Sequence, residues 1–327
     1  MKIIYIEPTL NVSSSKSKIM YFLRGRKLNV NQEGFFVQSL VPTKTISIKD
    51  FHKYRINNDE FLVVNSKATV EGTELNLYDQ FKLFKNLDMK KAIFLSNSHS
   101  SFMPEDKVLD LFDIVFKREP YKDLDRYNIS LKNKEKIRTT MLPCPLVKPK
   151  QLRSLKFSDK ADKKFDVFFN GQATHKDRLL ICEALKRDPS VIFMGGLQPR
   201  RTLSVPPEIY FKSLNIKMYK KLIQQSKINL ALEGMGDFTY RHLELLSQGA
   251  FMMCSSKIRD LNLPIELLDG EHYVSFENID DLQDKINEYL DKPEERSRIA
   301  RNGFKRFKRD YSFQKHGKYI LDQLMNI

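Results

Sequence analysis

The clearest structural pattern in the chain runs from residue 228 to residue 254 and reads INLALEGMGDFTYRHLELLSQGAFMMC. The apolar run Ile228–Leu232 predicts a buried strand, and the glycines of Glu233–Gly236 predict a turn after it. Apolar residues then recur at helical spacing over Tyr240–Ser247, and a glycine separates this predicted helix from a second apolar run, Ala250–Cys254. Strand, helix and strand in this order are typical of a parallel sheet covered by helices.

The same alternation extends over both halves of the chain. In the first half, the predicted strands are Met1–Ile6, Phe35–Leu40, Phe61–Val64, Ala92–Leu95 and Ile114–Phe116, with a helix over Glu74–Leu87. In the second half, strands are predicted at Phe165–Phe169, Val191–Met194 and Tyr273–Ser275, where Asn170-Gly171 and Gly195-Gly196 close the first two. Helices are predicted at Lys176–Lys186, Lys217–Gln225, Asp280–Leu290, Pro293–Lys308 and Phe313–Met325.

These elements predict an α/β protein with two Rossmann-like domains that face each other across a cleft. Residues 1–145 form the first domain, and residues 146–164, charged and preceded by prolines, form a linker. Residues 165–311 form the second domain. We expect the last helix, within residues 312–327, to return and complete the first domain.

Composition limits the class of protein and its location. The chain has 327 residues, 41% of them hydrophobic and 30% charged, as in a globular protein. No apolar run approaches the ~18 residues that span a bilayer, and the first strand does not resemble a secretory signal. Three widely spaced cysteines (Cys144, Cys182 and Cys254) argue against a disulfide framework, so we expect a cytoplasmic protein.

The net charge of +15 predicts an attraction to polyanions. Nucleic acid, phosphorylated substrates and anionic lipid headgroups all fit this charge, so peripheral contact with the inner face of a membrane is one expectation. The alternative is a lysine-rich composition that only solvates the surface.

Arg241 and Glu244 carry the strongest chemical signal. Arg241 falls in the first turn of the predicted helix, where free backbone N–H groups and the positive end of the helix dipole favour phosphate. Glu244 lies one turn further on, on the same face, where a carboxylate can accept hydrogen bonds from ribose hydroxyls. The alternative is an ordinary ion pair between these two residues on the helix surface.

The second half of the chain resembles glycosyltransferases of the GT-B fold, and in particular the "glycosyl transferases group 1" domain of spore-maturation-like proteins. The resemblance covers about Lys164 to Tyr311. It is carried by the segments 240–253 (YRHLELLSQGAFMM), 269–275 (DGEHYVS), 280–286 (DDLQDKI) and 293–300 (PEERSRIA).

The resemblance implies that Arg241 contacts the diphosphate of a nucleotide-sugar donor and that Glu244 contacts its ribose. It also implies that the loop after the domain's first strand lies against the diphosphate, with Gly171 in the loop and Arg178 neutralising the leaving group; the alternative for Arg178 is a solvated arginine. Glu233, Gly234 and Tyr240 are further candidate donor-binding residues.

For the acceptor side, the candidates follow two predicted strands of the first half. His99, with Asn97 beside it, comes after Ala92–Leu95 and is a candidate general base, because the histidine pKa lies near neutral pH. The alternative is a histidine that caps the following helix or is hydrogen-bonded in a loop. Arg118 and Glu119 come after Ile114–Phe116. They either line the cleft or belong to an exposed run of charged residues.

We expect neither a metal ion nor a resident cofactor. The six histidines show no metal-binding spacing, and Asp123-Leu-Asp125 matches the Asp-x-Asp metal signature only by chance, because it does not directly follow an apolar strand. Arg178, Arg241 and a helix dipole would then stabilise the departing nucleotide.

Three functions remain open at this point. The first is transfer of a sugar to a cell-surface glycan or glycolipid precursor, and the second is glycosylation of DNA held by the basic surface. The third is a non-catalytic nucleotide- or nucleic-acid-binding protein on a degenerate GT-B scaffold. The sequence identifies neither the sugar nor the nucleobase, and it leaves open whether the anomeric configuration is retained or inverted.

Overall fold

A computed structural model describes residues 2–6, 43–55, 57, 60–68, 76–95, 99–142, 144–147, 151–159, 161–200 and 203–326. The predicted strand Phe35–Leu40 and the candidate Asn97 lie outside these residues. The chain divides into two compact units. Unit 1 comprises Met1–Pro143, Asn262–Pro264 and Phe313–Ile327, and unit 2 comprises Cys144–Leu261 and Ile265–Ser312.

Unit 1 contains a six-stranded sheet in the order β2-β1-β3-β4-β5-β6, in which all neighbouring strands are parallel. Its strands are β1 (Lys2–Ile6), β2 (Thr43–Ile46), β3 (Glu60–Asn65), β4 (Lys91–Leu95), β5 (Ile114–Arg118) and β6 (Ile137–Thr140). Its α-helices are α3 (Leu77–Phe81), α4 (Asp106–Leu109), α5 (Leu131–Lys134) and α11 (Phe313–Met325), and its 3-10 helices are η1 (Ile48–Lys53), η2 (Lys82–Phe84) and η3 (Leu124–Arg126).

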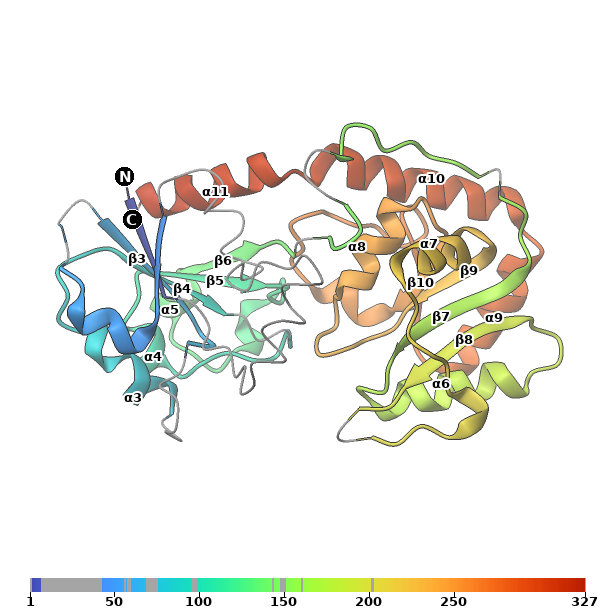
Figure 1. Ribbon diagram of the computed structural model, residues 1–327, viewed down its shortest axis with the longest axis horizontal. Helices are drawn as coiled ribbons and strands as arrows, with labels where there is room; N and C mark the ends of the chain where they lie inside the picture. Colours follow the sequence, from blue (N-terminus) through green and yellow to red (C-terminus); the bar gives the residue numbers. More distant parts are fainter. Residues whose placement is uncertain are drawn as a thin grey trace. The chain divides into compact units, whose positions relative to one another are not determined.

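The last helix, α11, packs beside β6 in unit 1 (Figure 1). Its His316 lies within 3.0 Å of the Thr140 hydroxyl and accepts a hydrogen bond from the backbone N–H of Met141. Gln323 accepts a second bond from Arg138. The expectation that the C-terminal helix completes the first domain is therefore confirmed.

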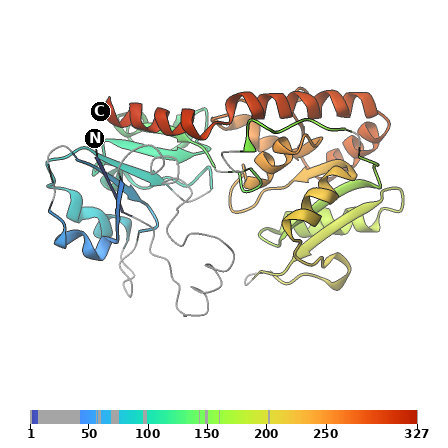
Figure 2. The same ribbon diagram turned by 45° about the horizontal axis from the view of Figure 1, so that its top comes forward.

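Unit 2 contains a five-stranded sheet, again parallel throughout, in the order β11-β10-β9-β7-β8 (Figure 2). Its strands are β7 (Phe165–Gln172), β8 (Phe193–Gln198), β9 (Ser226–Ala231), β10 (Met252–Ser255) and β11 (Val274–Phe276). Its α-helices are α6 (Lys176–Arg187), α7 (Ile216–Gln224), α8 (Tyr240–Ser247), α9 (Ile279–Leu290) and α10 (Pro293–Asp310), and its 3-10 helices are η5 (Pro207–Ile209) and η6 (Ser256–Asp260).

Each unit has its own apolar core, built by the alternation that the sequence predicts. In unit 2, Val167 and Phe169 of β7 and Ile228 of β9 are fully buried with Ile181 of α6 and Ile286 of α9. In unit 1, the core combines residues of β1, β3, β4 and β5 with a cluster of phenylalanines, Phe51, Phe81, Phe84 and Phe112. None of the helices among the described residues has the length and apolar character needed to cross a membrane.

Two glycines that we expected to close a strand lie inside β8 instead. Gly195 and Gly196 have φ angles of +129° and +141°, a region that favours glycine. A Cβ atom on Gly195 would lie 1.7 Å from the carbonyl oxygen of Phe169, and one on Gly196 would lie 2.2 Å from that of Ile209. The glycines therefore let β8 approach its neighbours closely, and the predicted strand Val191–Met194 is shifted to Phe193–Gln198.

Candidate donor-nucleotide site

The strand order of unit 2 places a switch point between β7 and β9. The chain leaves β7 through α6 to β8 on one side, and later returns through α7 to β9 on the other side of β7. In doubly wound sheets, ligands bind beyond the carboxyl ends of the strands at such a point. We call this end of the sheet the carboxyl edge, and it is here that the predicted donor-site residues come together.

Arg241, in the first turn of α8, reaches back to the end of β7. Its Nη2 atom donates a hydrogen bond to the carbonyl oxygen of Asn170. Its guanidinium carbon lies 5.1 Å from the ring centroid of Phe169 and 5.1 Å from that of Tyr219, which are cation–π distances. The other terminal nitrogen, Nη1, is buried and has no hydrogen-bond partner among the described residues.

Glu244, one turn further along α8, does not pair with Arg241. One of its carboxylate oxygens, Oε2, accepts a hydrogen bond of 2.8 Å from the hydroxyl of Tyr219 on α7. The alternative of a surface ion pair between Arg241 and Glu244 is therefore wrong for this structure. Both side chains contact Tyr219, a residue that no sequence pattern identifies as part of a binding site.

Arg178, at the start of α6, is only 8% exposed, so the alternative of a solvated arginine is also wrong. Its guanidinium donates to three backbone carbonyls: those of Gln172 after β7, and Leu232 and Glu233 after β9. Burial, and after it the charge of Arg241, lower the pKa of Arg178 to about 9, which leaves it protonated at neutral pH. Through these hydrogen bonds Arg178 connects the carboxyl ends of β7 and β9, the two strands that flank the switch point.

Gly171 and Gly234 leave the space that Arg178 occupies. A Cβ atom on Gly171 would lie 3.1 Å from Nη1 of Arg178, and one on Gly234 would lie 3.0 Å from its Nη2. The carbonyl of Gly234 also accepts a hydrogen bond from the ring of His175. Both glycines are needed for close packing around a buried cation.

Glu233 follows β9 and forms an ion pair with Lys257 of η6, whose Nζ lies 3.0 Å from the Glu233 carboxylate. Burial is the largest single influence and opposes the charged form of Lys257, but the hydrogen bond with Glu233 and the negative charges of Glu233 and nearby aspartates together raise the pKa of the lysine. Glu233 is therefore held away from Arg241 in a contact of its own.

Further buried polar atoms at the end of β7 also lack partners. The side-chain nitrogen Nδ2 of Asn170 and the hydroxyl of Thr174 are buried and make no hydrogen bond within the described part of the chain. Buried polar groups in proteins are nearly always bonded, so such groups call for an explanation. Together with Nη1 of Arg241, they form a set of hydrogen-bonding groups at the switch point that suits an anionic ligand.

The N-terminus of α8 is held in place by its own sequence. Thr239 and His242 form a capping box, in which the Thr239 backbone N–H donates to Nδ1 of His242 at 3.0 Å. The His242 ring stacks on Phe238 at 4.6 Å, and burial lowers its pKa to about 3, so the ring is neutral at neutral pH. Tyr240 occupies the first position of this helix, next to Arg241.

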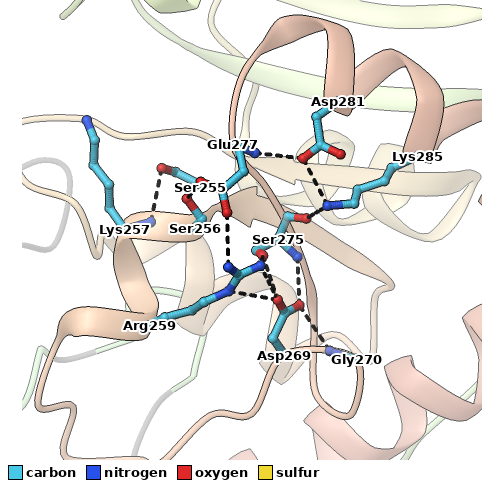
Figure 3. A network of polar contacts seen from close by, with 10 residues as sticks. All are labelled: Ser255, Ser256, Lys257, Arg259, Asp269, Gly270, Ser275, Glu277, Asp281 and Lys285. Atoms are coloured by element: carbon cyan, nitrogen blue, oxygen red, sulfur yellow. Dashed lines mark hydrogen bonds and ion pairs between the residues drawn. The ribbon is translucent and has the colours of Figure 1, made fainter.

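A separate polar network stabilises the outer part of the same carboxyl edge (Figure 3). Arg259 of η6 pairs with Asp269 and Glu277, and Asp269 also accepts bonds from the backbone and the hydroxyl of Ser275. Lys285 of α9 closes the network by donating to the Ser275 carbonyl. The segment 269–275, which contributed to the resemblance, thus has a structural role in joining η6, β11 and α9.

In unit 1, the carboxyl ends of the strands place the acceptor-side candidates in different environments. His99 is exposed, and its Nδ1 atom lies 2.7 Å from the Ser101 hydroxyl. Arg118 and Glu119 are only 6% and 1% exposed, so the alternative of an exposed charged run is wrong. Glu119 has a φ angle of +46°, a conformation that is uncommon for residues other than glycine.

The neighbouring Lys117 is fully buried and connects β5 to the segment that carries His99. Its Nζ atom donates a hydrogen bond of 2.9 Å to the carbonyl oxygen of His99. The Tyr127 hydroxyl donates to the carbonyl of Ser100 at 2.7 Å. The backbone around His99 is therefore fixed by buried groups, whereas its ring faces outward.

The Asp-x-Asp segment has structural roles. Asp123 caps η3 by accepting a bond from the backbone N–H of Asp125, and Asp125 pairs with Lys134 at 2.8 Å. No group of three or more histidine, cysteine or acidic side chains that could hold a metal ion occurs in the described ranges.

Sequence reasoning missed Tyr219, and it placed Asn170 and Thr174 in or beside the loop expected at the diphosphate without giving either side chain a role. Tyr219 has the appearance of an ordinary apolar position of an amphipathic helix, and Asn170 and Thr174 that of turn residues. A signal was available for Asn170, since a polar residue at the end of a buried strand beside the switch point is well placed for a ligand.

Two comparisons by sequence bear on the class of protein. Residues 178–322 match the model of a family described as glycosyl transferase-like. A search of curated protein sequences gives no match.

Solved structures extend the likeness to the whole chain. The DNA-modifying enzyme beta-glucosyltransferase, solved with and without uridine diphosphoglucose, superposes with a TM-score of 0.54 at 13% identity, over 99% of this chain and 100% of that one. HepE of Anabaena, in complex with UDP, gives a TM-score of 0.57 at 10% identity over 100% of both chains. TarM, known from S. aureus, gives 0.57 at 14% identity, over 84% of this chain and 57% of TarM.

These likenesses and the two doubly wound units define the GT-B fold. The chain therefore has the GT-B fold, and its residues 178–322 resemble the glycosyl transferase-like family. It spans little more than half the length of TarM.

Proposed function

We propose that this protein transfers a sugar from a nucleoside diphosphate sugar to an acceptor hydroxyl, and that unit 2 holds the donor. One observation carries the proposal: at the switch point of a parallel sheet, the Nη1 atom of Arg241 is buried and has no hydrogen-bond partner among the described residues, and the buried guanidinium of Arg178 lies close enough for the two charges to interact. These two neighbouring cations, one buried and one half-buried, repel each other, and an anion bound between strand end and helix N-terminus would relieve that cost. A diphosphate supplies such an anion.

Each site residue then has a proposed role. Arg241, with the Asn170 amide and the Thr174 hydroxyl, binds the diphosphate, while Glu244 accepts hydrogen bonds from the ribose. Arg178 acts on the diphosphate chiefly through its charge and by holding Gly171 and Gly234 in place, because its hydrogen bonds go to backbone carbonyls. Tyr240 and Glu233 border the site, and the contact of Glu233 with Lys257 makes it a weaker candidate for direct binding.

The proposed reaction follows from these roles. The acceptor oxygen bonds to the anomeric carbon, the bond from that carbon to the diphosphate oxygen breaks, and the acceptor proton passes to a base. Arg241 and the N-terminus of α8 stabilise the negative charge of the departing diphosphate. His99 is our candidate for the base, because its ring is exposed at a strand end of unit 1, with Asn97, Arg118 and Glu119 as the other acceptor-side candidates.

We propose that this charge stabilisation needs no metal ion, because two arginines supply positive charge at the site. One solved structure of the T4 phage enzyme BGT holds UDP together with Mn²⁺, so the point needs a direct test. Transfer rates measured with a chelator and with added Mn²⁺ should agree within about twofold. A rate that depends on Mn²⁺ would contradict this part of the proposal.

Nucleotide binding is tested most directly by thermal shift. UDP, GDP and ADP are added to the wild type, to Arg241→Ala and to Arg187→Ala. The last is a matched control, since Arg187 is 80% exposed and pairs only with Glu183. At a concentration 100 times its Kd, a diphosphate that binds the folded protein stabilises it by about 2.7 kcal/mol. The donor-site assignment fails if no nucleotide stabilises the wild type, or if Arg241→Ala responds as strongly; that result would favour a scaffold without catalysis.

For the acceptor, we propose a glycan or glycolipid precursor, with DNA as the second candidate. The net charge of +15 favours DNA, and so does the fold shared with a DNA-modifying glucosyltransferase over the full length of both chains. Retention on double-stranded DNA is compared with retention on anionic vesicles as salt is raised. DNA as acceptor requires specific transfer to DNA as well as retention that falls steeply with salt.

A further inference from the structure

Tyr219 contacts both Arg241 and Glu244. It lies on α7, is 9% exposed, and packs against Phe168 of β7 with ring centroids 5.9 Å apart. Its hydroxyl donates to Oε2 of Glu244 at 2.8 Å, and its ring lies 5.1 Å from the guanidinium carbon of Arg241. One rigid aromatic residue therefore links the two groups that we assign to the ribose and the diphosphate.

The contacts leave one free position on each partner. On Glu244, Oε2 is occupied by Tyr219, and no hydrogen bond to Oε1 is formed by the residues that the structure describes. On Arg241, Nη2 is occupied by the Asn170 carbonyl, and Nη1 is without a partner in the same part of the chain. Fixing one atom of a planar carboxylate or guanidinium restricts the direction in which the other points.

The hydroxyl of Tyr219 is a dependable donor. Burial raises the pKa of this phenol well above its ordinary value, so it keeps its proton at neutral pH. A neutral hydroxyl donates its hydrogen bond to Oε2 and leaves Oε1 of Glu244 as an acceptor for ribose hydroxyls.

We infer that Tyr219 is a positioning residue. It holds the side chains of Glu244 and Arg241 in the orientations that bind the ribose and the diphosphate of the same ribonucleoside diphosphate. The inference rests on the proposed donor site and adds a specificity: the site selects for ribose hydroxyls because Tyr219 directs Oε1 of Glu244 toward them. The ring of Tyr219 acts on diphosphate binding by orienting Arg241, and its hydroxyl acts on ribose binding by orienting Glu244. Substitutions that remove the hydroxyl alone or the whole ring can therefore separate these two contributions to affinity.

Two substitutions separate them. Tyr219→Phe keeps the ring and removes the hydroxyl, whereas Tyr219→Leu removes both. Affinities for UDP and for 2′,3′-dideoxy-UDP are measured by calorimetry on the wild type, both variants and Tyr289→Phe. Tyr289 is the matched control, because it lies on α9 and packs against Phe251 instead of the site.

We expect the wild type to prefer UDP over its dideoxy analogue by at least about tenfold, since a lost hydrogen bond to a charged group costs about 1.5–3 kcal/mol. In Tyr219→Phe this preference should fall below about threefold, while dideoxy-UDP binding changes little. Tyr219→Leu should in addition weaken the binding of both nucleotides, and Tyr289→Phe should behave as wild type.

A double-mutant cycle with Glu244→Gln provides a second readout. If Tyr219 acts through Glu244, the double variant should discriminate no worse than Glu244→Gln alone. A preference for UDP that persists in Tyr219→Phe, or additive effects in the cycle, would overturn the inference and leave the donor site standing. Absence of UDP binding to the wild type would instead refute the proposed donor site itself, and the role of Tyr219 with it.

Discussion

The carboxyl edges of the two sheets use their charged residues in opposite ways. In unit 2, the buried Arg178 and the half-buried Arg241 meet at a switch point where Nη1 of Arg241 has no partner among the described residues. In unit 1, Lys117 at the corresponding end of β5 is bonded to the carbonyl of His99, and Arg118 and Glu119 are buried beside it. In unit 1 the charge of Lys117 holds the backbone and leaves the exposed His99 ring as the available group, whereas in unit 2 the unpaired atom of Arg241 is the basis of the proposed donor site.

This contrast teaches that burial of a charged residue does not by itself indicate a binding site. Arg178 and Lys117 are both buried cations near strand ends, and both donate to backbone carbonyls. The distinction lies in the unpaired donor atom of Arg241. The contrast leads to four predictions, which follow from the largest expected effect to the smallest.

The close packing of β7 against β8 is predicted to be the most sensitive feature of unit 2. Gly195→Ala places a Cβ atom 1.7 Å from the Phe169 carbonyl and strains a backbone with φ of +129°. Backbone strain of about 1–3 kcal/mol and overpacking of about 1–3 kcal/mol should together lower the free energy of unfolding by about 4 kcal/mol. Gly270→Ala is the control, because its φ is +73° but nothing lies within 4 Å. It should cost only about 1–2 kcal/mol in urea unfolding, and equal losses would contradict the packing argument.

Arg178→Lys tests whether this arginine supports the fold or contacts only the ligand. A lysine cannot reach all three carbonyls that Arg178 bonds, so stability without nucleotide should fall by about 3 kcal/mol. Arg187→Lys, on the exposed end of the same helix, should leave it unchanged. Arg241→Ala should act mainly on the stabilisation by nucleotide, which separates the two arginines. An Arg178→Lys protein as stable as wild type would make Arg178 a ligand residue only.

His99→Ala tests the acceptor side in unit 1. Among the described residues, the exposed ring forms a hydrogen bond with Ser101 alone, so stability and UDP binding should remain as in wild type. If His99 is the general base, kcat for transfer should fall about 100-fold. Ser101→Ala is the matched control, with an expected loss below about tenfold. Unchanged kcat in His99→Ala would assign the histidine a purely local role.

The buried histidines predict a similar pH dependence for both units. Burial lowers the pKa of His316 in unit 1 and of His242 in unit 2 to about 3 each. The unfolded chain takes up a proton near pH 6.5 and the folded chain does not, so stability falls as the pH falls from about 6.5 toward 3. Each histidine should contribute a loss of about 1 kcal/mol between pH 7 and pH 5.5.

Urea unfolding at several pH values checks this dependence. His316→Gln and His242→Gln should each flatten the profile, while His52→Gln, at an exposed position, should not. A profile that neither substitution changes would show that other groups dominate the acid sensitivity.

Much of the fold follows from local pattern. The predicted helices Tyr240–Ser247 and Phe313–Met325 agree with α8 and α11 at both ends, because an apolar stripe and a following turn or glycine define them locally. The sequence did not predict β2 and β6, which are four-residue strands with no long apolar run. It also ended β8 too early, because a glycine pair that usually signals a turn here permits close approach of a neighbouring strand.

The sequence by itself determined the α/β class and the alternation that makes two parallel sheets. It also indicated the Arg241–Glu244 segment, since these properties depend on residues close together in the chain. Only the tertiary structure decided how those residues are used. It separated Arg241 from Glu244, turned Arg178 toward the backbone and introduced Tyr219 between them. The hydrogen bonds of Glu244 with Tyr219 and of Arg241 with Asn170 join residues that are 25 and 71 positions apart in the chain. Such contacts depend on how side chains of different strands and helices pack, which no local pattern encodes.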